Sequence, residues 1–353
     1  MPLLLNPDMF LCIIKTMIQE KDIHYLNYII KNEDSDATVL YILREKMKLT
    51  TRKIRALKQE SCGILLNGTP VTVREYVQPG QQLQAMLNDS SQKKDWRKNG
   101  NGILTETELM ILYEDEDILF VNKPQGMVCH PSKGHGEDTL YHVVCAYLEK
   151  TEQNANIHLF GRLDKDTSGI VGIAKNKVMA ERMNVLRQQG SLKKEYLALV
   201  DGCPFPSEGT ITYPMEEDRS AGYLKMVKGT GTSAKAAVTH YKVLQTYSGQ
   251  SSLLCGQHQA VTLCLLTLET GRTHQIRFHM AAIGCPLLGD PIYADDASIT
   301  ENRWIERSAL HAWKVQFCHP FTGEKIKMTA DLPQDMKEAI QIAIGKKSGK
   351  EKL

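Results

Sequence analysis

The sequence has no uninterrupted apolar run of the roughly 18 residues that a membrane-spanning helix needs. Its apolar stretch 9–14 has neither a basic segment before it nor a small-residue cleavage site, so we expect no signal peptide. It also lacks a dominant charge, because 43 Lys and Arg balance 41 Asp and Glu. Net charge alone therefore does not indicate a nucleic-acid partner.

No C-x-x-C pair occurs among the nine cysteines, whose number is odd and whose positions are scattered. Without an export signal, this pattern favours reduced, mostly buried thiols in a cytoplasmic protein over a disulfide framework. The chain does have an ordinary globular composition, 42% hydrophobic and 24% charged, which excludes a disordered protein. At roughly 150 residues per domain, the 353 residues predict about two domains.

Turn-forming residues and shifts in composition divide the chain into segments. The first carries no usable motif, and Met17 within it is an alternative start. The second has the pattern of a strand, two helices and a hairpin that turns at Asn67-Gly68. A polar, glycine-bearing linker leads to a large domain of strands and helices, followed by a helix and a Lys-rich tail. The predicted segments are 1–25, 26–87, 88–107, 108–332 and 333–353.

Basic residues concentrate in the second segment. Residues 44–58 contain seven Lys and Arg but one acid, Glu45. Such a run is usually a solvated helix face, but on a compact helix pair beside a hairpin it also matches the footprint of a phosphate backbone. We therefore expect RNA binding at the second of these helices, through Arg52, Lys53, Arg55 and Lys58.

The densest polar cluster is residues 161–169, Gly-Arg-Leu-Asp-Lys-Asp-Thr-Ser-Gly. A calcium loop starting at Asp164 is excluded, because the position of its bidentate Glu is occupied by Lys175. An aspartyl phosphotransferase would use the Asp pair with Mg²⁺, but Arg162 is poorly placed beside such a cation. A purely structural loop, in which the two acids cap turns, is the third interpretation.

A second cluster, residues 271–279, reads Gly-Arg-Thr-His-Gln-Ile-Arg-Phe-His. Its two histidines, His274 and His279, are five residues apart, so they do not share a helix face as zinc ligands would. Arg272, Arg277 and the start of the predicted helix could instead face anionic groups. A structural helix with internal salt bridges is equally compatible with this segment alone.

Together these segments resemble the RluA/RluD-type family of RNA pseudouridine synthases. The family motif H-R-L-D-x-x-T-S-G corresponds to residues 161–169, with Gly161 in place of the usual His. The motif G-R-T-H-Q-I-R-x-H stands intact at 271–279, and residues 26–87 resemble the S4 RNA-binding domain. Three further family elements follow the same order: N-K-P-x-G at 122–126, K-x-Y at 194–196 and the closing L-H-A-x-x-x-x-F-x-H-P at 310–320.

The resemblance implies an α+β fold around a mixed, mainly antiparallel sheet, and isomerisation of uridine to pseudouridine in structured RNA without metal or cofactor. Asp164 would be either the nucleophile or the base that removes a ribose proton, and Arg277 would pair with it. Tyr196 would lie against the uracil and accept its C5 proton. Arg162 would enter the space left by the flipped base, and Arg272 would contribute to RNA binding.

The S4-like segment favours ribosomal RNA of the large subunit over tRNA as the partner, and we expect a cytoplasmic monomer. Because Gly161 departs from the family motif, a non-catalytic RNA-binding or ribosome-assembly factor is one alternative. A Mg²⁺-dependent aspartyl phosphatase is the other.

Overall fold

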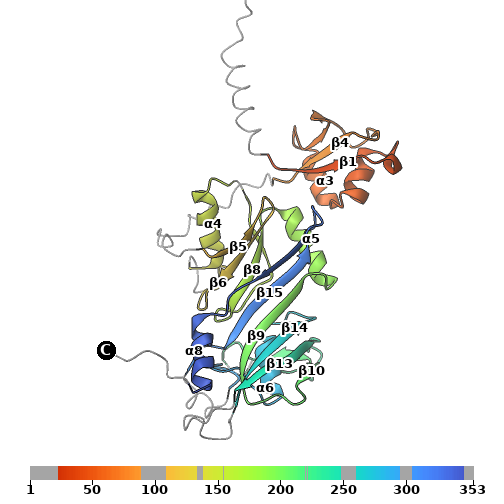
Figure 1. Ribbon diagram of the computed structural model, residues 1–353. Coiled ribbons are helices and arrows are strands. Elements are labelled where there is room, and N and C mark those ends of the chain that lie inside the picture. Colours follow the sequence, from red (N-terminus) through yellow and green to blue (C-terminus); the bar gives the residue numbers. More distant parts are fainter. Residues whose placement is uncertain are drawn as a thin grey trace, which may run out of the picture. The chain divides into compact units, whose positions relative to one another are not determined.

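The computed structural model describes residues 23–88, 109–132, 138–153, 155–218, 220, 222–247, 260–294 and 304–345. The predictions for residues 1–22, for nearly all of the linker and for the Lys-rich tail lie outside these ranges. The described residues form two compact units, one built on a four-stranded sheet and the other on a ten-stranded sheet (Figure 1). No helix in these ranges is long and apolar enough to cross a membrane.

The smaller sheet has the strand order β1-β4-β2-β3. Its hairpin turns at Asn67 and Gly68, which both have positive φ, 51° and 77°, as the predicted Asn-Gly turn requires. The two predicted helices also form, and the side chains of Thr38 and Thr50 cap their first turns. The elements are β1 (Tyr25–Ile29), α2 (Val39–Tyr41), the π-helical η2 (Ile42–Lys46), α3 (Thr51–Leu57), β2 (Ile64–Leu66), β3 (Thr69–Pro70) and β4 (Gln82–Met86).

The larger sheet follows the order β10-β13-β14-β9-β15-β8-β6-β5, with β16 beside β15 and β7 beside β8. Most of its ladders are antiparallel and β8–β15 is parallel, so the predicted α+β fold with a mixed sheet is confirmed. The strands are β5 (Ile111–Glu114), β6 (Ile118–Lys123), β7 (His158–Phe160), β8 (Ser168–Ala174), β9 (Lys193–Asp201), β10 (Glu208–Ile211), β13 (Thr239–Tyr247), β14 (Val261–Leu268), β15 (Leu310–Cys318) and β16 (Lys325–Thr329). A separate hairpin pairs β11 (Met215–Glu217) with β12 (Met226–Lys228).

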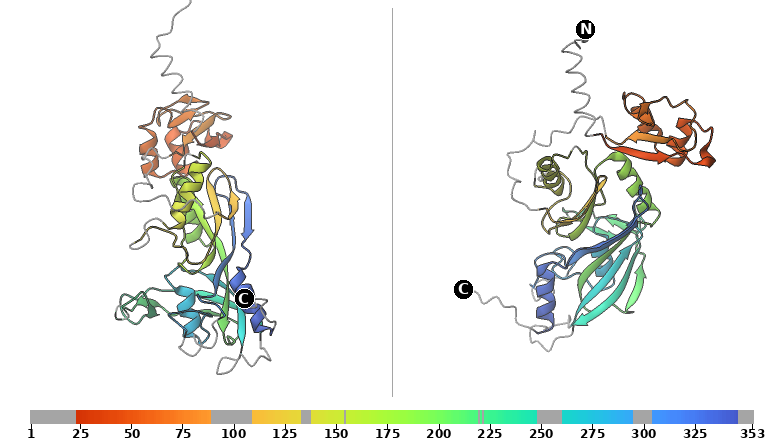
Figure 2. Two further views of the ribbon diagram at one scale, coloured as in Figure 1. Left: turned by 90° about the vertical axis from the view of Figure 1, so that its left-hand side faces the viewer. Right: turned by 45° about the horizontal axis from the view of Figure 1, so that its top comes forward.

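Strand β15 joins β8, which begins within the first cluster at Ser168, to β9, which carries Tyr196. It lies between β8 and β9, and Figures 1 and 2 show it in blue beside the green β9. Gly169 on β8 has φ of 110°, and a Cβ there would lie 2.3 Å from the carbonyl oxygen of Ala312 on β15. Only glycine permits this approach, because any side chain would collide with the neighbouring backbone.

The remaining helices are α4 (Leu140–Lys150), α5 (Lys177–Gln188), α6 (Gln275–Ala282) and α8 (Gln334–Ala343). Helix α8 buries Met336, Ala339 and Ala343 in a core cluster with Leu199 and Val261 of the sheet. The described cysteines form no disulfide, as predicted. Of the seven described cysteines, three are buried, two are half-buried and two are exposed: in that order, Cys129, Cys264 and Cys285, then Cys62 and Cys145, then Cys203 and Cys318.

Candidate active site

A pocket of about 1000 Å³ brings the two polar clusters together. It is lined by the Asp164 loop, by the start of β9 with Tyr196, and by residues 267–277. The structure therefore places the predicted residues Arg162, Arg272 and Arg277 around the same space as Asp164. Cations outnumber acids in this lining: they are Arg162, Arg187, Lys193, Lys194, Arg272 and Arg277, against Asp164, Glu195 and Glu269.

Two buried side chains fix the backbone on either side of Asp164. The fully buried Lys123 donates from Nζ to the carbonyl oxygen of Lys165 at 3.0 Å, and also to two carbonyls of its own turn. Burial lowers the pKa of Lys123 to about 8. Cys129 lies with Sγ 3.4 Å from both the backbone nitrogen and the carbonyl oxygen of Leu163. The backbone on both sides of Asp164 is thus bonded to the last residue of β6 and to the segment that follows it.

Arg307 and His311 hold the rest of this loop. Arg307 donates from Nη1 to the carbonyl oxygen of Asp166 at 3.0 Å, and its Nε and Nη2 bind the two carboxylate oxygens of Asp335 at 2.6 and 3.0 Å. His311 Nδ1 lies 2.9 Å from Ser168 Oγ. Burial lowers the pKa of His311 to about 4, so the neutral ring accepts from Ser168 and donates to the carbonyl of Ala330.

Tyr196 is 8% exposed on β9 and lies near Asp164. Burial, together with the negative charge of Asp164, raises the pKa of Tyr196 to about 12. The phenol is therefore the form present at neutral pH. This form suits packing against a base better than it suits proton acceptance, which requires the phenolate.

Arg277 does not form the expected hydrogen-bonded pair with Asp164. Its Nε and Nη2 bind Asp290 at 2.6 and 2.7 Å, and both side chains are buried. Burial alone would raise the pKa of Asp290, but the hydrogen bond and charge of Arg277 lower it overall. Asp290 outcompetes Asp164 because two buried charges with bidentate geometry satisfy each other. Asp164 acts on Arg277 only through its charge.

Arg162 and Arg272 lie at the exposed side of the pocket. Arg162 donates from Nη2 to Thr273 Oγ1 at 2.9 Å, which ties the first cluster to the second. Arg272 donates from Nε to the carbonyl of Ala236 at 3.2 Å. Both guanidiniums keep further donors for an anionic ligand.

Comparison with known proteins identifies the family to which this chain belongs. The family model described as RNA pseudouridylate synthase matches residues 117–282. The uncharacterized RNA pseudouridine synthase YlyB of Bacillus subtilis is 36% identical over 79% of this chain and 84% of its own. The ribosomal large subunit pseudouridine synthase D of Pseudomonas aeruginosa is 33% identical, over 77% of this chain and 81% of its own. The chain belongs to the RNA pseudouridine synthase family.

A solved structure agrees with this assignment. Human RNA pseudouridylate synthase domain containing 4 is similar with a TM-score of 0.52 and 25% identity, over 66% of this chain and 92% of that chain. The RluA-type resemblance and the predicted uridine isomerisation in RNA are thereby confirmed. This pseudouridine synthase is an isomerase, and the phosphatase alternative is wrong.

The basic helix α3 of the pseudouridine synthase lies outside this pocket. Arg52, Arg55 and Lys58 are exposed along it. Lys53 points elsewhere: its ammonium donates to the carbonyl oxygens of Leu87 and Asn88 at 3.0 and 3.2 Å. Lys53 therefore stabilises the smaller unit by binding the end of its chain segment. The other three of the four predicted cations are exposed to solvent.

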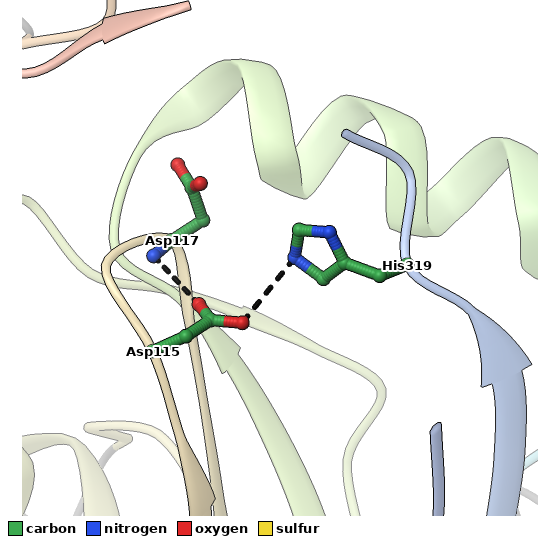
Figure 3. A group of neighbouring side chains, drawn as sticks. All are labelled: Asp115, Asp117 and His319. Carbon is green, nitrogen blue, oxygen red and sulfur yellow. Dashed lines mark hydrogen bonds and ion pairs between the residues drawn. The ribbon is translucent and has the colours of Figure 1, made fainter. Parts of the chain in front are cut away.

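Within the part of the chain that the structure describes, one group has the donor types of a metal site: Asp115, Asp117 and His319 (Figure 3). His319 Nδ1 accepts from the backbone N–H groups of residues 321 and 322 at 3.3 and 3.1 Å. In the neutral ring the proton must then sit on Nε2, which faces Asp115 Oδ2 at 3.4 Å. Asp115 also accepts from the backbone N–H of Asp117. His319 Nδ1 and Asp115 Oδ1 are thus both engaged as acceptors of backbone N–H groups in local turns.

Sequence reasoning missed most of the supporting residues of the synthase. Lys123 and His311 stood within recognised motifs, which was the available signal for them. Cys129, Asp290 and Arg307 lay outside the residues singled out for chemistry, and no local pattern marks them.

Proposed function

We propose that this pseudouridine synthase modifies uridines of large-subunit ribosomal RNA, as a cytoplasmic monomer. The RNA class is supported by its relatives from Pseudomonas aeruginosa and Escherichia coli, which are named ribosomal large subunit pseudouridine synthases D. Both motif clusters reach the pocket from one chain, which supports action without a second subunit. The observation that carries the proposal is Asp164 beside Tyr196 in a pocket rich in cations.

In the proposed reaction, the uridine N1–C1′ bond breaks, the uracil turns, and a C5–C1′ bond forms. The C5 proton passes to water and N1 takes up a proton from water, so the product is an isomer of the substrate. Asp164 acts on the ribose or the uracil, as nucleophile or as the base for a ribose proton. The backbone bonds of Lys123 and Cys129 fix its position before the substrate arrives, so less freedom is lost on reaching the reactive geometry.

Three further residues complete the proposed site. Tyr196 packs against the uracil, and its neutral hydroxyl can donate a hydrogen bond to the base. Arg162 fills the space that the flipped base leaves, since its planar guanidinium both stacks and binds phosphate. Arg277 contributes positive charge near Asp164 while Asp290 holds its orientation.

The smaller unit is proposed to bind RNA as an S4-like domain at residues 26–87. Its exposed cations Arg52, Arg55 and Lys58 on α3 would contact phosphates, which fix the position of the enzyme without reading sequence.

The test is tritium release from 5-³H-uridine in transcripts of large-subunit ribosomal RNA and of tRNA, with excess chelator present. Asp164→Asn should abolish release, because it removes the carboxylate while preserving the side-chain shape. The matched control is Asp166→Asn, on the same loop but outside the pocket lining, which should retain most of the activity. Tight binding of the wild-type protein without release from either RNA would favour the ribosome-assembly alternative. Release from tRNA alone would overturn the ribosomal assignment.

A further inference from the structure

Lys194 and Tyr196 share one face of β9. Residues two apart in a strand point the same way and lie about 7 Å apart. Both side chains line the pocket, and Tyr196 is the nearer to Asp164 in electrostatic terms, since the charge of Asp164 affects its pKa but not that of Lys194. If the uracil lies against Tyr196, Lys194 is about as far from the uracil as a backbone phosphate is from the base of its nucleotide.

The ammonium of Lys194 has no anionic partner within the described ranges. The two other acids of the pocket are already engaged: Glu195 binds Lys314 at 2.6 Å, and Glu269 binds His240 at 2.9 Å. The neighbouring charge with the largest effect on the pKa of Lys194 is another cation, Arg187. Burial and this like charge lower the pKa of Lys194 to about 8. A half-buried ammonium next to a second cation is electrostatically unfavourable when no anion is bound. Binding of an anion offsets this unfavourable energy.

Gly161 leaves open the space next to this ammonium. Its φ is 91°, and a Cβ placed there would lie 2.9 Å from Lys194 Nζ. This is the position at which the family motif has His, so a side chain there would crowd the ammonium. The absence of a side chain therefore gives a ligand access to Lys194 from the side of the Asp164 loop.

We propose that Lys194, in the opening left by Gly161, binds a backbone phosphate adjacent to the target uridine. This rests on the proposed function, because the uracil must occupy the place beside Tyr196. The ligand is a phosphodiester of the substrate RNA, and Arg187 adds charge from the rim. Lys suits a single phosphate oxygen because its ammonium is a compact charge with three donors.

The experiment uses a stem-loop cut from whichever transcript releases tritium with the wild-type protein. Dissociation constants are measured for the natural RNA and for two RNAs in which a neutral methylphosphonate replaces the phosphate 5′ or 3′ of the target uridine. We expect one of the two replacements to weaken wild-type binding about tenfold, as loss of one charged contact does. Lys194→Met should weaken natural RNA binding to the same extent, show no further loss with that methylphosphonate, and reduce the salt slope by about 1.

Two variants exclude trivial explanations. Lys194→Arg keeps the charge and should bind natural RNA within about threefold of wild type. Lys242→Met removes a lysine on β13, outside the pocket lining, and should lose affinity for the methylphosphonate RNA as the wild type does. Equal losses in wild type and Lys194→Met would overturn the phosphate contact while the proposed function stands. No tritium release by the wild-type protein from either transcript would overturn both.

Discussion

Five cations that line the pocket or bond to its Asp164 loop form two sets that differ in what binds them. Lys123, Arg277 and Arg307 are buried and satisfied by protein groups: backbone carbonyls, Asp290 and Asp335. Lys194 and Arg187 line the same pocket and have no protein anion in the described ranges. The first set shapes the site before RNA binds, whereas the second is complete only with a polyanion. Positive charge at a pocket therefore does not by itself mark a binding surface. A cation that is buried and bound by protein groups shapes the site, whereas one without a protein anion is available to a ligand.

The largest expected effect comes from breaking a partner of the buried set. Asp290→Asn leaves the charge of Arg277 buried without its anion, which should lower the free energy of unfolding by about 3–5 kcal/mol and strongly reduce turnover. Urea unfolding measures the first and tritium release the second. The matched control is Glu195→Gln, which breaks the less buried pair with Lys314 and should cost about 1 kcal/mol. Similar losses in both variants would contradict the distinction between buried and accessible pairs.

His311 provides a pH test of the same set. Its pKa falls from 6.5 to about 4 in the folded protein, so between these values the unfolded state binds more protons than the folded one. Stability contributed by neutral His311 is thus present above pH 6.5 and lost as the pH falls, by up to about 3 kcal/mol near pH 4. Urea unfolding from pH 7 to pH 4 should show a smaller decline for His311→Gln than for wild type. Identical slopes would show that His311 does not titrate this way.

The smallest effect concerns the unpaired set. Gly161→Ala and Gly284→Ala both place a side chain at positive φ, 91° and 79°. Each should cost about 1–2 kcal/mol of stability from backbone strain. Only at position 161 does the new Cβ meet Lys194 Nζ, since nothing lies within 4 Å at Gly284. RNA affinity should therefore fall severalfold for Gly161→Ala and stay unchanged for Gly284→Ala, as filter binding can measure. Gly161→His, which restores the family residue, should bind no better than Gly161→Ala.

Local pattern accounts for much of the fold. The Asn67-Gly68 turn, the two helices before it and the helix of the second cluster all form as predicted. These features depend on neighbours in sequence: turn residues, capping groups and apolar periodicity. The motif order also placed Asp164, Arg162 and Tyr196 around one pocket.

Hydrogen bonds and ion pairs between residues far apart in the chain could not be predicted from the sequence. Arg277 was expected beside Asp164, yet Asp290 takes it, because the choice between two acids depends on which one the fold buries against the guanidinium. Lys53 was counted with the RNA-binding cations, but the end of β4 brings carbonyl oxygens within its reach. Cys129 and Arg307 contact the Asp164 loop from distant segments, and no spacing rule connects them to it.

The position of β15 in the sheet has a consequence for how the enzyme folds during its synthesis. The Asp164 loop leads into β8 and Tyr196 lies on β9, but these strands are joined through β15, which is synthesised long after both. Until residues 310–318 leave the ribosome, β8 and β9 each lack this neighbour, and such long-range pairing is a slow step of folding. A nascent chain thus carries both motif clusters in full without an assembled pocket. The pocket is therefore complete only after β15 has paired with both strands.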